Sequence, residues 1–173
     1  GLNTYTGPTV IMNQGSSTPP PRIVTRFLAD GGQASGIGAS SNAASNLVFN
    51  GRTGTDGSGI LWTGYSSQST DRLFTLGTGG GAGAIWANGQ NIGDDPASLS
   101  WTNTGAIEFL APNTDQTLIL RGTNISNNTF APLLRDNGSG QTSLSKLDAG
   151  MWVLTNANSY SGGTSISNGT LAI

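Results

Sequence analysis

Short apolar runs alternate with stretches of turn residues along the whole chain. Between the runs lie Asn-Gly, Asp-Gly and Gly-Gly steps, which favour tight turns with positive φ. The runs have the length of strands and are too short for stable helices. The pattern predicts strands at residues 9–12, 22–28, 46–50, 59–63, 72–76, 84–87, 98–102, 106–110, 117–121, 151–155, 164–167 and 170–173.

The composition supports an all-β fold. The 173 residues include 27 Gly, 21 Thr, 20 Ser and 16 Asn, which all rank low as helix formers. Only Ala39–Ser45 has a plausibly helical composition, and we expect one short helix there. Apolar residues are 35% of the chain and charged residues 9%, so the core must be thin and main-chain pairing extensive.

Three consecutive prolines divide the chain. Pro19-Pro20-Pro21 cannot lie in a central strand and favours a stiff extended connector. We therefore expect an N-terminal extended β segment at residues 1–18, a proline linker at 19–21, and a β-domain at 22–173.

One sequence motif occurs twice. Residues 3–11 read Asn-Thr-Tyr-Thr-Gly-Pro-Thr-Val-Ile, and residues 158–166 read Asn-Ser-Tyr-Ser-Gly-Gly-Thr-Ser-Ile. One copy precedes the prolines and the other lies near residue 173, so the same module flanks the interior of the chain.

The second copy belongs to a longer motif. Residues 150–171 resemble the autotransporter-associated β-strand repeat, whose pattern is G-x-W-x-L-(S/T)-G-x-N-T-Y-(S/T)-G-G-T-x-(I/V)-x-x-G-T-L. Asn156 departs from the pattern, because Gly is usual there. The interior resembles large repetitive surface proteins that carry this module, at residues 28–47, 69–77, 101–107 and 117–129.

The resemblance implies a secreted or surface-displayed bacterial protein that is adhesin-like or without assigned activity. It also implies a β-solenoid, so we expect a right-handed parallel β-helix. Stacked rungs would bury small apolar rows and place Gly and Asn at the corners. The alternative is an antiparallel β-sandwich or jelly roll with an extended N-terminal strand, because the strand spacing also suits it and the interior lacks a strict period.

Composition excludes several function classes. The chain has no Cys and no His, which removes thiol nucleophiles, Ser-His-Asp triads and zinc ribbons. A net charge of −2 with seven basic residues gives no footprint for nucleic acid. There is no apolar run long enough for a membrane helix and no signal-peptide pattern at Gly1. We expect a non-enzymatic protein without cofactor or metal.

The carboxylates are the remaining candidates for catalysis. Asp94-Asp95 is the densest pair, but adjacent strand residues face opposite ways and Asp-Pro is common in turns. Glu108 lies between apolar neighbours and is expected to face solvent. Residues 51–56 fall one Gly short of a calcium-binding nonapeptide, and residues 77–83 lack the Lys of a phosphate loop, so both are interpreted as turns.

Aromatic and Asn residues suggest two kinds of binding or modification. Trp62, Trp86, Trp101 and Trp152 lie in predicted strands and are expected in the core, although such residues also line sugar-binding grooves. The sequons at Asn124, Asn127, Asn137 and Asn168 are as many as chance predicts in a chain so rich in Asn, Ser and Thr, so they carry no evidence of glycosylation.

These observations lead to three hypotheses. The first is an extracellular structural protein that associates with itself end to end, as the protomer or repeat unit of a filament, with terminal β segments forming a heterologous contact. The second is a carbohydrate- or surface-binding adhesin module with glycan partners. The third is a polysaccharide-active enzyme. For the first, the residues predicted to self-associate are Asn3, Tyr5, Val10, Ile11, Tyr160, Ile166 and Leu171.

Overall fold

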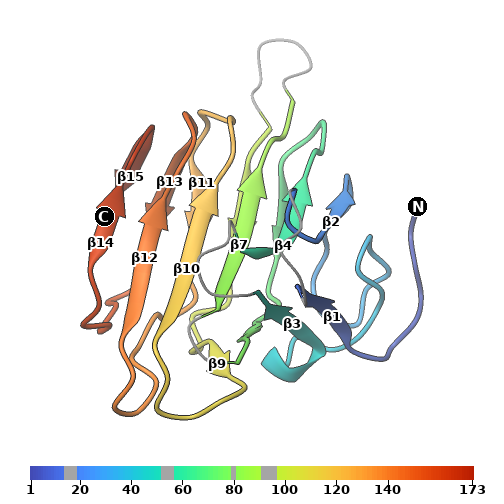
Figure 1. The fold of residues 1–173 in the computed structure, drawn as a ribbon. Helices are drawn as coiled ribbons and strands as arrows, with labels where there is room; N and C mark the ends of the chain where they lie inside the picture. Colours follow the sequence, from blue (N-terminus) through green and yellow to red (C-terminus); the bar gives the residue numbers. More distant parts are fainter. Residues whose placement is uncertain (14–18, 52–56, 79–80, 91–96) are drawn as a thin grey trace.

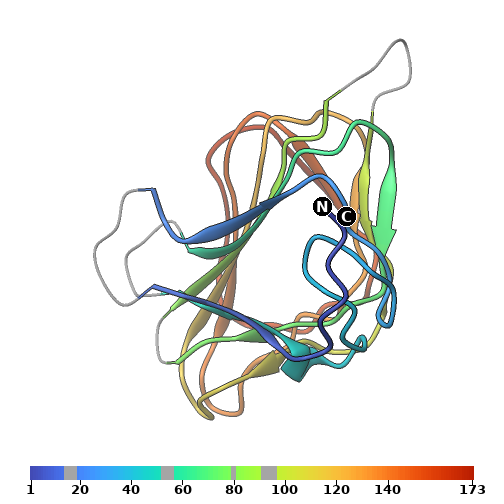
Figure 2. The same cartoon turned by 90° about the vertical axis from the view of Figure 1, so that its right-hand side faces the viewer.

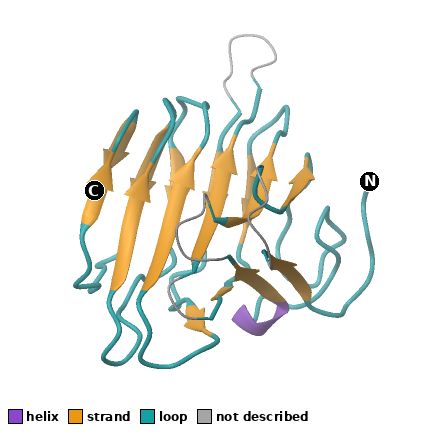
Figure 3. Cartoon of the chain, viewed as in Figure 1, coloured by secondary structure: helices purple, strands orange, loops and turns teal. Residues whose placement is uncertain are grey.

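The chain forms a parallel β-solenoid made of three sheets (Figures 1 and 3). The computed structural model describes residues 1–13, 19–51, 57–78, 81–90 and 97–173. All pairings between the strands of these residues are parallel, and each strand pairs with the equivalent strand one rung away.

Each sheet collects one strand from successive rungs. The first sheet contains β1 (Thr9–Met12), β3 (Leu47–Asn50), β6 (Thr75–Leu76) and β9 (Glu108–Phe109). The second contains β2 (Arg22–Thr25), β4 (Ser58–Trp62), β7 (Ala82–Ala87), β10 (Gln116–Arg121), β12 (Thr142–Lys146) and β14 (Thr164–Ile166). The third contains β5 (Gln68–Thr70), β8 (Leu99–Trp101), β11 (Asn128–Phe130), β13 (Met151–Leu154) and β15 (Thr170–Ala172).

This arrangement confirms the solenoid prediction, and the antiparallel sandwich is wrong. A sandwich would pair neighbouring strands in opposite directions, whereas here each strand pairs with one that follows it by a whole rung. The rungs differ in length: Arg22 pairs with Gly59, 37 residues on, and Leu144 pairs with Thr164, 20 residues on. Loops of different length at the corners absorb that difference, which explains the missing sequence period.

The helix expected at residues 39–45 is replaced by η1, a single 3₁₀ turn at Ala44–Asn46. Asn46 donates from its side-chain Nδ2 to the hydroxyl of Ser41 at 2.8 Å, which favours a turn over a continuing helix. None of the described helical residues forms a segment long and apolar enough to cross a membrane.

The core is a stack of aliphatic and aromatic side chains along the solenoid axis. In the second sheet, one inward-facing column runs through Ile60, Ile85, Leu120 and Lys146 in register. On the opposite side of the core, Phe49 stacks on Phe74 with ring centroids 4.9 Å apart, and Phe74 meets Trp101 and Phe130 at 5.5 and 6.1 Å. Stacked rungs thus build a continuous apolar interior from few residues each.

A loop at residues 28–42 covers the core at the N-terminal side of the stack. Figure 2 shows this segment within the outline of the strands. Its Ile37 is buried at 1% exposure and belongs to the main core cluster. Asn3 forms an antiparallel bridge with Ser35, and the main-chain N–H of Ala39 donates to the carbonyl of Tyr5 at 2.7 Å.

Arg72 holds this loop from within. Its side chain is 2% exposed, and its guanidinium donates to the hydroxyl of Ser40 and to four main-chain carbonyls, those of Ala29, Asp30, Gln33 and Gly38, at 2.8 to 3.4 Å. Burial lowers the Arg72 pKa, and the nearby Asp71 carboxylate acts in the opposite direction. The planar fork of five N–H donors matches this set of acceptors, which a Lys could not do.

Replacing Arg72 tests whether the loop depends on it. We expect Arg72→Met to lower the free energy of unfolding by about 3 kcal/mol, because five oxygens lose their donor and the bonds to Ser40 and Gly38 are buried. Urea unfolding measures the change, and protease cleavage within residues 28–42 should become faster.

The matched control is Arg135→Met. Arg135 forms an ion pair with Glu108 at 3.2 Å, but both side chains are largely exposed, so the expected loss is under about 1 kcal/mol. Equal losses for the two variants would contradict the role given to Arg72.

Candidate functional site

The two copies of the repeated motif adopt the same local structure. The hydroxyl groups of Tyr5 and Thr9 lie 2.9 Å apart, and those of Tyr160 and Thr164 lie 2.8 Å apart. In both copies the Tyr therefore closes the turn that leads into a strand, β1 in the first copy and β14 in the second. The copies enter different sheets, so the motif is a corner module that the solenoid uses at two positions.

The first copy lies at the N-terminal side of the stack. β1 pairs with β3 of the same chain, from Thr9 with Leu47 to Met12 with Asn50. Ile11 is in the core at 7% exposure, whereas Val10 is 48% exposed. Asn3 and Tyr5 contact the loop at residues 28–42. Pairing of residues 1–18 with another copy stays a prediction.

The second copy lies at the opposite edge. β14 pairs with β12 and β15 pairs with β13, and each is the outermost strand of its sheet. Ile166 is 54% exposed, and Tyr160 and Leu171 are partly buried against the core. Next to these strands is a hollow of about 520 Å³ lined by Leu154, Asn156, Ala157, Asn158, Tyr160, Gly162, Thr164, Leu171 and Ile173.

The corners between sheets are joined by Asn side chains. Nδ2 of Asn124 donates to the carbonyls of Gly89 and Ala97 at 2.9 and 2.7 Å, and Nδ2 of Asn137 donates to that of Ala111. Both Asn side chains are 6% exposed, so their amide nitrogens are engaged in the fold. The other two sequon residues, Asn127 and Asn168, are exposed.

The four Trp side chains are all buried. Trp62, Trp101 and Trp152 are in the core at 0% exposure, as expected. Trp86 faces outward from the second sheet but is 5% exposed, because the guanidinium groups of Arg22 and Arg121 lie over its ring at 5.6 and 5.5 Å. Cation–π contact thus covers the one outward Trp, and these four residues do not form an open sugar-binding face.

A charged cluster ties the turn after β12 to the neighbouring rungs. Arg121 forms a two-pronged ion pair with Asp148 at 3.1 and 3.2 Å. Lys146 is fully buried, and its ammonium donates to the carbonyls of Leu147, Asp148 and Asn168 at 2.6, 2.7 and 3.1 Å. All three ammonium donors are therefore satisfied, and they join the turns of two consecutive rungs.

The pKa values in this cluster follow from its geometry. Burial lowers the pKa of Lys146, and the Asp148 carboxylate acts against that shift. Partial burial raises the pKa of Asp148. Hydrogen bonds from Arg121 and from the Gly122 N–H lower this pKa by a larger amount, so the net shift is downward. Asp148 also has a positive φ of 62°. It is thus an ionised structural residue of the turn.

The carboxylates are the candidate catalytic and metal-ligating side chains. Among the described residues, no three His, Cys, Asp or Glu side chains gather into a possible metal site. Glu108 is exposed, as expected, and pairs with Arg135. Asp94, Asp95 and the residues 52–56 of the calcium-like motif lie outside the described residues.

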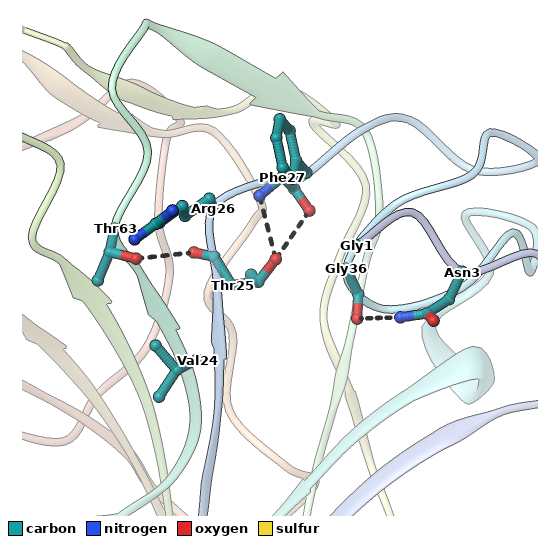
Figure 4. Close-up of a pocket in the computed structure, with 8 residues that line it drawn as sticks. All are labelled: Gly1, Asn3, Val24, Thr25, Arg26, Phe27, Gly36 and Thr63. Carbon is teal, nitrogen blue, oxygen red and sulfur yellow. Dashed lines mark hydrogen bonds between the residues drawn. The ribbon is translucent and has the colours of Figure 1, made fainter.

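A second hollow lies at the N-terminal side (Figure 4). It measures about 430 Å³ and is lined by Gly1, Asn3, Val24, Thr25, Arg26, Phe27, Gly36 and Thr63. Sequence reasoning missed this hollow and the buried Arg72 and Lys146. Their only signal was their rarity: Lys146 is the one Lys of the chain and lies in an alternating strand, where an inward charge needs partners.

Comparison with known proteins confirms the resemblance described above. Residues 1–16 and 144–173 match the family model of the passenger-associated-transport-repeat. Over 125 residues, the chain is 46% identical to the adhesin BmaC autotransporter of Brucella suis biovar 1 (strain 1330). The alignment covers 72% of this chain and 3% of the relative. No solved structure matches. These matches place the chain outside the cell or at the cell surface.

The ion pair of Asp148 predicts a pH dependence. Because its pKa is lowered in the folded state, its contribution to stability is present above the unfolded value near ~3.9 and is lost as the pH falls below it. We expect Asp148→Asn to cost roughly 1 kcal/mol at pH 7, allowing for solvent screening, and less at pH 3. Urea unfolding of both proteins at the two pH values checks this. A difference that is the same at both would contradict it.

Proposed function

This chain carries two matches to the passenger-associated transport repeat of autotransporters, and from that premise we propose that it is a structural length of an extracellular passenger. In this proposal it forms part of a β-solenoid stalk with an adhesin-like role and stacks end to end on neighbouring lengths that carry the same repeat. The chain spans 3% of its relative, so it would be one of many such lengths.

The observation that carries the proposal is that the sides of the first and second sheets run to both edges of the stack. At one edge, β14 ends the second sheet and β15 ends the third. Residues 158–161 continue the side of the first sheet, because the N–H groups of Ser159 and Ser161 donate to Leu134 and Asp136 of the rung before. At the other edge, β1 and β2 begin the first and second sheets. Rungs added at either edge would continue the same sheets in the same direction.

Both edges have the properties of strands that pair further. β14 and β15 are paired on one side only, so alternate main-chain N–H and C=O groups point outward. Apolar side chains lie beside these groups: Ile166 at one edge, and Val10 and Val24 at 48% and 60% exposure at the other. A further rung beside β14 would extend the core over Ile166, and one beside β2 would cover Val24, which lies in register with Leu61 and the outward-facing Trp86.

The two edges are not equivalent, which makes the contact heterologous. The loop at residues 28–42 covers the core beside β1 and β2, whereas the hollow beside Leu154 and Leu171 leaves the core open at the other edge. A heterologous contact that does not close on itself produces a linear array. Notably, the proposal needs no catalytic group.

A charge placed at the open edge should block stacking. Ile166 faces the core column but is 54% exposed, so Ile166→Lys should cost little stability and should oppose the burial of a further rung. We expect the unmodified chain to form end-to-end oligomers at high concentration and the variant to remain monomeric. Light scattering after size exclusion and negative-stain microscopy measure this.

The matched control is Ile125→Lys. Ile125 is 72% exposed in the turn after β10, away from both edges, so this variant should associate like the unmodified chain. A monomeric unmodified chain, or oligomers that survive Ile166→Lys, would overturn the stacking proposal.

A further inference from the structure

The hollow at the N-terminal side is lined by Arg26, whose guanidinium has no acidic partner among the described residues. Arg26 is exposed, and among the described residues its guanidinium forms neither a hydrogen bond nor an ion pair. None of the side chains that line the hollow is acidic. The N–H donors of Arg26 are therefore free to bind an anionic group of a ligand.

Arg26 is nevertheless held in position. Its guanidinium lies 4.9 Å from the centroid of the Tyr65 ring. Gln68 fixes the backbone around it, because its Nε2 donates to the carbonyl of Arg26 at 2.7 Å and its Oε1 accepts from the N–H of Leu28 at 2.8 Å. A donor fixed in this way loses less entropy when it binds than a free surface Arg.

The next residue supplies an exposed aromatic ring. Phe27 is 48% exposed and, like Arg26, lines the hollow; in Figure 4 the two side chains leave the chain in different directions. The turn beneath it is rigid, since the hydroxyl of Thr25 donates to the carbonyl of Phe27 and accepts from its N–H at 3.1 and 3.0 Å. On the opposite side, Asn3 donates through Nδ2 to the carbonyl of Gly36, and Figure 4 draws its Oδ1 without a hydrogen bond to the other labelled residues.

From this juxtaposition we propose that the hollow binds a sugar residue that carries a carboxylate, as sialic and uronic acids do. Arg26 pairs with the carboxylate, the Phe27 ring packs against the apolar face of the sugar ring, and Asn3 accepts from a hydroxyl. The volume of about 430 Å³ is in the range of small-ligand sites and suits one or two sugar rings. The hollow adjoins β2 at the N-terminal edge, so under the proposed function it is open in a single copy and in the copy at that end of a stack. Binding and stacking are nevertheless tested separately, because none of these residues belongs to the edge at β14 and β15.

The test compares two probes that differ in the carboxylate. Binding of sialyllactose and of lactose to the full 173-residue chain is followed by NMR titration at low salt. We expect a dissociation constant on the order of 1 mM for sialyllactose and binding at least about tenfold weaker for lactose. Arg26→Gln should weaken sialyllactose binding by about tenfold or more, and Phe27→Ala should weaken it too.

Two controls separate the site from the surface and from stacking. Arg135→Gln removes another exposed Arg that lies over an aromatic ring, Phe109, and should leave binding unchanged. The Ile166→Lys variant should bind sialyllactose normally even if it no longer stacks. Circular dichroism and thermal unfolding confirm that each variant is folded.

Several results would overturn the proposal. They are equal binding of lactose and sialyllactose, binding that survives Arg26→Gln, or no binding of sialyllactose at ~10 mM. A tetraglutamate peptide that binds as tightly as sialyllactose would also overturn it, because recognition would then need only the carboxylate and the partner would be an acidic peptide.

Discussion

Main-chain hydrogen bonding between successive rungs is the interaction on which this solenoid depends. Apolar residues are 35% of the chain and each strand is short, so no single rung buries enough surface to be stable. Parallel pairing satisfies the backbone of every inner strand on both sides and stacks the few inward side chains of each rung into continuous columns. A core that is thin in one rung becomes long and unbroken in six.

Rungs of unequal length are compatible with this pairing because side-chain donors satisfy the backbone at the corners. Where the chain turns between sheets, main-chain carbonyls lose their ladder partners and need others. Asn124 and Asn137 supply amide donors, Lys146 supplies three ammonium donors, and Arg72 supplies a guanidinium fork. In a strictly repeating solenoid, each turn could pair with an identical turn in the next rung. Here the turns differ in length, and these buried polar side chains supply the hydrogen bonds instead.

The two surfaces proposed for function lie at different parts of the stack. The open edge at β14 and β15 continues the sheets, and its chemistry is that of unpaired backbone beside apolar side chains. The hollow beside Arg26 and Phe27 has the chemistry of a ligand site, with a free donor next to an exposed ring. Because the hollow adjoins edge strand β2, a stack would leave it open only in the copy at its N-terminal end, which would combine a structural stalk with an adhesive tip.

By itself, the sequence determined the all-β fold class and the resemblance to the autotransporter repeat. Turn residues between short apolar runs exclude long helices, and the spacing of Trp152, Tyr160 and Leu171 identifies the repeat, because both are local properties of the chain. The sequence left the strand direction open, since a parallel and an antiparallel sheet can have the same alternation. Only the pairing of residues 19 to 38 positions apart decided it. The tertiary structure likewise decided the buried environments of Arg72 and Lys146, the arginine cover over Trp86 and the hollow beside Arg26. Each of these depends on contacts between rungs. Because the rungs differ in length, the sequence separation of two residues does not predict whether they are in contact.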